Sequence, residues 1–103
     1  MEAKQVTVIA RCKAKPGREE ETRQEILALV GPTRSEAGCL NYDLHVSTGD
    51  PGLFLLYENW RSMADLDRHL ATPYLERFKV LAPDLLAEPI DIALYEMITA
   101  PGK

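Results

Sequence analysis

The sequence contains few of the features that mark metal-binding, disulfide-rich or membrane-spanning proteins. Its 103 residues include two cysteines, and Cys12 and Cys39 stand at no spacing typical of a metal or redox motif. Because disulfides are uncommon in the cytosol, both cysteines are predicted to be packed, reduced thiols. No apolar run approaches the roughly 20 residues that a membrane-spanning helix requires, so no membrane partner is expected.

Positive charge is also scarce. The formal net charge is −4 at pH 7, and the 12 Lys and Arg residues are spread along the chain without a basic cluster. Binding to a nucleic-acid backbone depends on clustered positive charge, so no nucleic-acid partner is expected. The chain begins with a strand pattern and not with an apolar secretory leader, which predicts a cytoplasmic location.

Three kinds of reactive site are not indicated either. The two histidines, His45 and His69, lie on different predicted elements without a nearby cluster of ligand-type residues, so no metal site is predicted. Ser35, Ser47 and Ser62 stand in turns or caps, and none has the setting of a nucleophile elbow. The glycines punctuate turns and form no phosphate-binding loop.

The sequence does contain a regular succession of strand and helix patterns. Alternation along the chain predicts strands at residues 5–13, 40–47 and 90–98, and an apolar run after a turn predicts a strand at residues 53–60. Apolar residues at three- and four-residue spacing predict one helix from Arg18 to Gly31-Pro32. Ser62 is predicted to cap a second helical segment, and Thr72 with Pro73 to start a third, whose exit Pro83 and Pro89 bracket.

The order of these elements predicts the α+β class. A β-α-β-β-α-β succession is the ferredoxin-like arrangement, with a four-stranded antiparallel sheet and the helices on one face. We expect one domain over residues 1–103, with residues 98–103 as a loose tail. Residues 53–57 (LFLLY) are apolar without alternation, and Tyr95 and Met97 add apolar groups to the face without helices. A second copy packed sheet against sheet would cover that face, so a two-fold homodimer is expected.

Three stretches resemble the antibiotic biosynthesis monooxygenase (ABM) superfamily. They are GCLNYDLH (38–45), LFLLYENW (53–60) and DLDRHLATPYLERF (65–78), and the similarity runs over nearly the whole chain. The most specific part is Tyr-Glu-x-Trp at residues 57–60, followed by His-Leu-x-Thr-Pro at residues 69–73. The sequence is most similar to the small quinol monooxygenase type. This resemblance implies a dimeric α+β barrel that oxidises a quinol or phenolic small molecule with dioxygen, using no metal, flavin or haem cofactor.

The sequence departs from the family pattern at three places. The family commonly has a His after the Thr-Pro pair, where this chain has Tyr74. The haem-degrading branch carries an iron-ligating His on the last helix, and residues 76–79 here contain no histidine. In the antibiotic-tailoring branch an Asn faces the substrate four residues before the Trp, and this position is Leu56.

The resemblance also implies a cavity between the helices and the strand face that carries Trp60. Alternation places Glu58 on that face, and a buried carboxylate needs a partner or a proton. His69, on the inward stripe of the next helix, is the expected partner. We hypothesise that His69 removes a phenolic proton, that Glu58 orients His69, and that Trp60 forms a wall for the aromatic ring. The residues expected to contact the substrate are Tyr42, Leu56, Leu66, Tyr74 and Phe78.

Other interpretations stay open from the sequence. A Glu58–His69 hydrogen bond could be purely structural, and the aromatic residues could simply pack in the core. The same fold also hosts cofactor-free isomerases or epimerases of small hydroxyketones or phosphorylated sugars, which would use the same base without oxygen. A third alternative is a non-catalytic binding or stress-response module whose pocket is merely packed core, with no cavity between Trp60 and His69.

Overall fold

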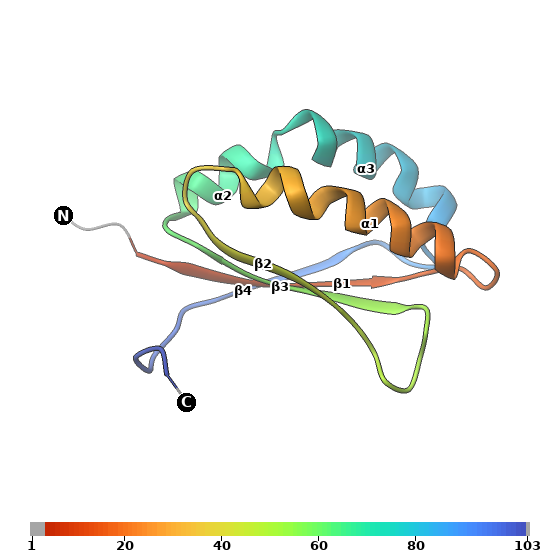
Figure 1. Cartoon of the computed structure of the whole chain (residues 1–103), viewed down its shortest axis with the longest axis horizontal. Helices are drawn as coiled ribbons and strands as arrows, with labels where there is room; N and C mark the ends of the chain where they lie inside the picture. Colours follow the sequence, from red (N-terminus) through yellow and green to blue (C-terminus); the bar gives the residue numbers. More distant parts are fainter. Residues whose placement is uncertain (1–3, 103) are drawn as a thin grey trace.

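The computed structural model describes residues 4–102, which form one antiparallel sheet covered on one face by helices (Figure 1). The strands are β1 (Val6–Lys13), β2 (Cys39–Val46), β3 (Leu53–Trp60) and β4 (Asp91–Tyr95), in the spatial order β2-β3-β1-β4. The helices are α1 (Glu19–Arg34), α2 (Met63–Leu70) and α3 (Pro73–Leu85). The predicted ferredoxin-like α+β fold is confirmed. Residues 1–3 and 103, which the single-domain and tail predictions include, lie outside the described part.

The pairing register sorts the strand residues into an inward and an outward face. Val8 of β1 pairs with Glu58 of β3, and these inward residues are 2% and 4% exposed. On the outward face Ile9 pairs with Tyr57, which is 37% exposed. Burial therefore alternates along β3 although residues 53–57 are apolar throughout, because the helices cover one face of the strand.

One helix runs past the proline that was predicted to end it, and a second helix also contains a proline. α1 continues through Pro32 to Arg34, and α3 contains Pro83 and ends at Leu85, between the two prolines predicted to bracket its exit. A proline inside a helix loses one hydrogen bond and strains the preceding turn. In both helices a completely or almost completely buried residue follows the proline, Thr33 in α1 and Leu85 in α3. Packing of these last turns against the domain outweighs the local cost of proline.

The break between α2 and α3 was predicted correctly. The Ser62 side chain accepts a hydrogen bond from the Asp65 backbone N–H at 3.2 Å and so caps α2. Thr72 caps α3, with Pro73 at its start, and the Thr72 hydroxyl donates to the His69 carbonyl at 2.8 Å. These contacts fix how the end of α2, which carries His69, joins α3.

The helices cover the sheet unevenly. α1 packs against β2 and α3, and α2 packs against β3. The edge strand β4, shorter than the predicted segment 90–98, places Ile92 and Leu94 opposite Ala10 and Val8, on the helix side of the sheet. Ile92 and Leu94 are nevertheless 48% and 50% exposed. The layer between helices and sheet is therefore open along β4.

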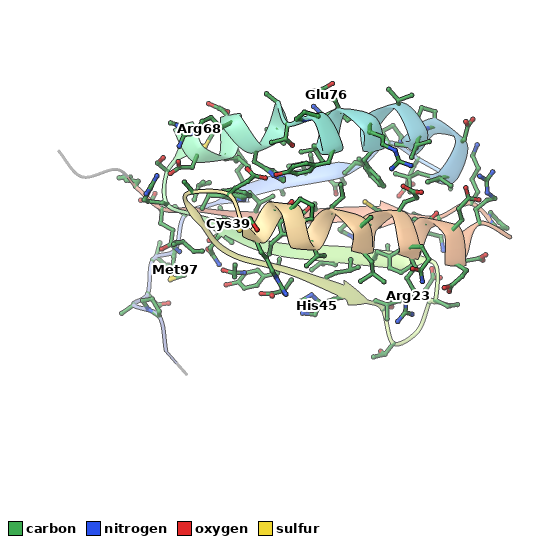
Figure 2. All side chains as sticks on the ribbon, turned by 45° about the horizontal axis from the view of Figure 1, so that its top comes forward. Arg23, Cys39, His45, Arg68, Glu76 and Met97 are labelled. Atoms are coloured by element: carbon green, nitrogen blue, oxygen red, sulfur yellow. The ribbon has the colours of Figure 1, made fainter. Side chains whose placement is uncertain are left out.

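The opposite face of the sheet carries no helix within residues 4–102 (Figures 1 and 2). Figure 2 shows His45 projecting from β2 on this side, away from the helices. No helix in the described part of the chain is long and apolar enough to cross a membrane.

Candidate active site

A cavity of about 370 Å³ lies between the helices and the inward face of the sheet. Its walls are mostly aliphatic side chains from β1, α1, α2 and α3. Volumes of a few hundred Å³ are typical of sites for small molecules. Six of the eight predicted site residues line this cavity: Tyr42, Leu56, Glu58, Leu66, His69 and Phe78.

The cavity opens along β4. Ile92 and Leu94 belong to its lining and are about half exposed, as described above. On the facing helices the lining includes Met63, which is 45% exposed, and the exposed residues Asp67 and Lys79. A ligand would therefore enter between β4 and the α2–α3 segment, past one acidic and one basic side chain.

Glu58 places a carboxyl group on the cavity wall. The Trp60 indole Nε1 donates a hydrogen bond to Glu58 Oε1 at 2.9 Å, from two residues along the same strand face. Burial raises the pKa of Glu58 to about 7, assisted by the negative charge of Glu36 and opposed by the Trp60 hydrogen bond. Near neutral pH, Glu58 can therefore either donate or accept a proton.

The expected partner of His69 was wrong. His69 Nδ1 forms its hydrogen bond with Glu36 Oε2, at 2.8 Å, and not with Glu58. Glu36 follows the last turn of α1, whose end is closed by hydrogen bonds from the Ser35 and Glu36 N–H groups to the Pro32 and Thr33 carbonyls. Because α1 continues past Pro32, the Glu36 side chain reaches α2.

Trp60 is not the cavity wall that was predicted. It is completely buried, and its ring packs on the His69 ring with centroids 4.6 Å apart and planes tilted by 32°. Tyr42 contacts the same imidazole edge-on, at 5.5 Å. Trp60 thus lies behind His69 and beside Glu58, where it orients both groups without itself bordering the cavity.

Tyr74 is also absent from the cavity lining, contrary to the prediction that it contacts the substrate. Its hydroxyl donates a hydrogen bond to Glu36 Oε2, the oxygen that also binds His69. Helical spacing placed Tyr74 at the edge of the apolar stripe of α3, and at that edge the side chain reaches α1 instead of the cavity.

Two further protic groups line the cavity. Tyr42, which is 1% exposed, lies opposite Glu58 in the β2–β3 pairing, and burial together with the Glu58 charge holds its pKa above the usual range. Cys12 of β1 is a free thiol, and burial raises its pKa to about 11. Within residues 4–102, no three His, Cys, Asp or Glu side chains lie close enough together to hold a metal ion.

The sequence did contain a signal for Glu36. Ile26, Leu29, Thr33 and Glu36 follow one another at the three- and four-residue spacing of a single helix face. This stripe runs directly across Pro32. Following the spacing past the proline would have placed Glu36 at the helix end nearest to α2.

These features define a ferredoxin-like domain whose apolar cavity carries an imidazole, a carboxyl group and a phenol on its walls. The profile of the antibiotic biosynthesis monooxygenase family matches residues 5–80. The chain belongs to this family.

Individual proteins are similar to most of this chain. The chain is 37% identical over 92 residues to "Uncharacterized protein sll1783" of Synechocystis sp.. These residues are 89% of this chain but only 63% of that protein. It is 35% identical over 89 residues to "Putative monooxygenase Rv0793" of Mycobacterium tuberculosis, covering 86% of this chain and 87% of the relative. The crystal structure of PA3566 from Pseudomonas aeruginosa matches with a TM-score of 0.90 and 38% identity, over 96% of this chain and 99% of that one.

Proposed function

We propose that this protein is a cofactor-independent monooxygenase that oxidises a quinol or phenolic small molecule with dioxygen. One observation carries the proposal: the apolar cavity has on its walls both His69 and a carboxyl group, Glu58, with a pKa of about 7. Apolar walls suit a flat aromatic body, and a carboxyl group with this pKa can exchange a proton with it near neutral pH. Membership of a monooxygenase family supports the reaction class.

The electron balance requires no second reductant. A hydroquinone and dioxygen give a hydroxyquinone and water, so the substrate supplies all four electrons that reduce the oxygen molecule. One oxygen atom becomes bonded to a ring carbon, and the other leaves in water together with the two hydrogens that the substrate loses.

His69 is the proposed base for the first step. It removes the phenolic proton, and the resulting anion is electron-rich enough to pass an electron to dioxygen. Recombination then forms a carbon–oxygen bond and a peroxide. When the O–O bond breaks, the ring carbon that bears the peroxide loses its hydrogen as a proton and becomes a carbonyl carbon, and Glu58 in its acid form gives a proton to the departing hydroxide, which leaves as water. The apolar walls protect the anion from water during these steps.

A homodimer is part of the proposal. In the single chain the helix-free face of the sheet exposes apolar side chains, among them Tyr57 at 37% and Tyr95 at 56%. A two-fold partner packed sheet against sheet would cover this face. The two free thiols fit a reducing compartment, and we place the protein in the cytoplasm.

The test is oxygen uptake on a panel of hydroquinones and naphthohydroquinones, each corrected for spontaneous oxidation without protein. With ¹⁸O₂, one labelled atom is expected in the product. Replacing His69 by Gln should lower kcat/KM by about 10²- to 10⁴-fold, the usual contribution of a general base. His45→Gln is the matched control, because His45 is exposed and points away from the cavity (Figure 2).

Two results would contradict the proposal. Conversion of substrate without oxygen uptake would favour the cofactor-free isomerase. Equal activity of the His69→Gln and His45→Gln variants would remove His69 from the chemistry. The non-catalytic alternative predicted no cavity between Trp60 and His69, and these two rings do pack on each other with centroids 4.6 Å apart. The cavity lined by His69 and Glu58 is the observation that supports the enzyme instead.

A further inference from the structure

Glu36 joins three elements next to the cavity. It follows α1, and its Oε2 accepts hydrogen bonds from His69 Nδ1 on α2 and from the Tyr74 hydroxyl on α3. The His69 side chain is 3% exposed, whereas that of Glu36 is 16% exposed. Glu36 therefore lies between a buried imidazole and the solvent, outside the cavity lining.

The hydrogen bond from His69 defines which ring nitrogen can act as a base. A carboxylate can only accept, so the hydrogen atom of this bond belongs to Nδ1. In the neutral ring Nε2 is then the unprotonated nitrogen. A base that takes a proton inside an apolar cavity must lose it again before the next turnover. Within residues 4–102, neither Glu58 nor Tyr42, which line the same cavity, forms a hydrogen bond with His69, whereas Glu36 does.

We infer that Glu36 is the route by which the proton taken up by His69 leaves for solvent, and that Tyr74 positions Glu36 for this role. The inference rests on the proposed function of His69 as the base. In the transfer an Nε2–H bond forms with the substrate proton, and the Nδ1–H bond breaks. The released proton forms an O–H bond on Glu36, which then gives it to water.

Tyr74 is suited to hold Glu36 without joining the transfer. Burial raises the pKa of Tyr74 to about 12, and its hydrogen bond to Glu36 acts in the same direction. The phenol therefore keeps its proton and remains a donor at neutral pH. Within residues 4–102 no group donates to Glu36 Oε1, so this second oxygen is free to meet water.

The alternative is that Glu36 only ties α1 to the other two helices. Glu36→Gln separates the two roles, because the amide can still accept hydrogen bonds but cannot take up a proton. With a quinol substrate, kcat should fall at least tenfold while KM changes less than twofold. Tyr74→Phe, which removes one of the two hydrogen bonds, should lower kcat by a smaller factor. The matched control is Glu25→Gln, because Glu25 also links α1 to α3, through Arg77 at 2.7 Å.

Chemical rescue gives a second measurement. Formate should restore part of the kcat of Glu36→Ala in a saturable manner, because it supplies the missing carboxylate in the space left by the side chain. It should have no effect on the wild type or on Glu25→Gln. An unchanged kcat in Glu36→Gln, or no rescue of Glu36→Ala by formate, would overturn the inference.

A measurement without substrate keeps this inference distinct from the proposed function. Long-range proton–nitrogen NMR correlations report which ring nitrogen of a histidine is protonated, and His45 provides a reference in the same spectrum. The wild type should show His69 protonated at Nδ1, and Glu36→Ala should lose this preference. The two outcomes are separate. If the wild type oxidises no quinol, the proposed function fails. If the His69 tautomer is the same in Glu36→Ala as in the wild type, the inference about Glu36 is overturned.

Discussion

Replacing Glu58 by Gln should remove a large pH dependence of the stability. Burial raises the pKa of Glu58 from 4.5 to about 7. At about 1.4 kcal/mol per pKa unit, this rise corresponds to at most about 3.5 kcal/mol of free energy of unfolding. The glutamine amide has nearly the same shape as a protonated Glu58, and its carbonyl can still accept the Trp60 hydrogen bond.

The direction of the effect follows from which state holds the proton. Between pH 4.5 and about 7 the folded protein keeps the Glu58 proton and the unfolded chain does not. The stabilisation is therefore fully present below pH 4.5 and is lost as the pH rises through about 7. Between pH 5 and pH 8, the wild type should lose about 2.5 kcal/mol more stability than Glu58→Gln.

Urea unfolding at pH 5, 6, 7 and 8 measures this difference. The protein concentration must be the same throughout, because association of subunits adds to the apparent stability. Glu20→Gln is the control, since Glu20 is exposed on α1 and its loss should leave the pH profile unchanged. If the wild type and Glu58→Gln lose stability in parallel between pH 5 and pH 8, Glu58 does not hold a proton in the folded protein.

Two further predictions concern the fold and the assembly. Gly17 and Gly38 have φ angles of +87° and +88°, and a Cβ at Gly17 would meet open space whereas one at Gly38 would overlap the Asp65 carboxylate. Gly17→Ala should lower the free energy of unfolding by about 1 kcal/mol, and Gly38→Ala should lower it by about 1–3 kcal/mol more. Equal losses in urea unfolding would contradict the overlap of a Cβ at residue 38 with Asp65. Tyr57→Glu on the helix-free face should convert the proposed dimer to a monomer in analytical ultracentrifugation, with Val80→Glu, 77% exposed on α3, as the control. An undisturbed dimer in Tyr57→Glu would place the interface elsewhere.

The fold could be predicted because its signals are local and repeated. Alternation along residues 5–13, and counting back from Trp60 along residues 53–60, predicted which side chains share a face of the sheet, and the register of β1 with β3 agrees. The helix ends were less predictable. Pro32 is a strong local signal for a helix end, but packing of Thr33 decided the outcome for α1, and such packing is not visible in a stretch of a few residues.

The site was predictable to the extent that strand alternation determines it. Counting from Trp60 placed Glu58 and Leu56 on the cavity side, where the structure also has them. Alternation gives the face of a side chain but not its depth, and Trp60 lies behind His69 instead of beside the cavity. Glu36 is 33 residues from His69 in the sequence, so their contact depends on where α1 ends relative to α2.

The position of Trp60 explains how His69 and Glu58 can line one cavity without pairing with each other. Its indole N–H donates to Glu58, and its ring face packs against His69, so each group is held by a different part of the same side chain. Glu58 has no cationic partner among its described contacts, and burial can therefore raise its pKa toward neutrality. His69 instead receives a carboxylate from outside the cavity, Glu36. If Glu58 had formed the predicted pair with His69, its attraction to a protonated imidazole would have lowered the pKa of Glu58 and kept it a charged carboxylate. The cavity would then contain a base without a nearby acid.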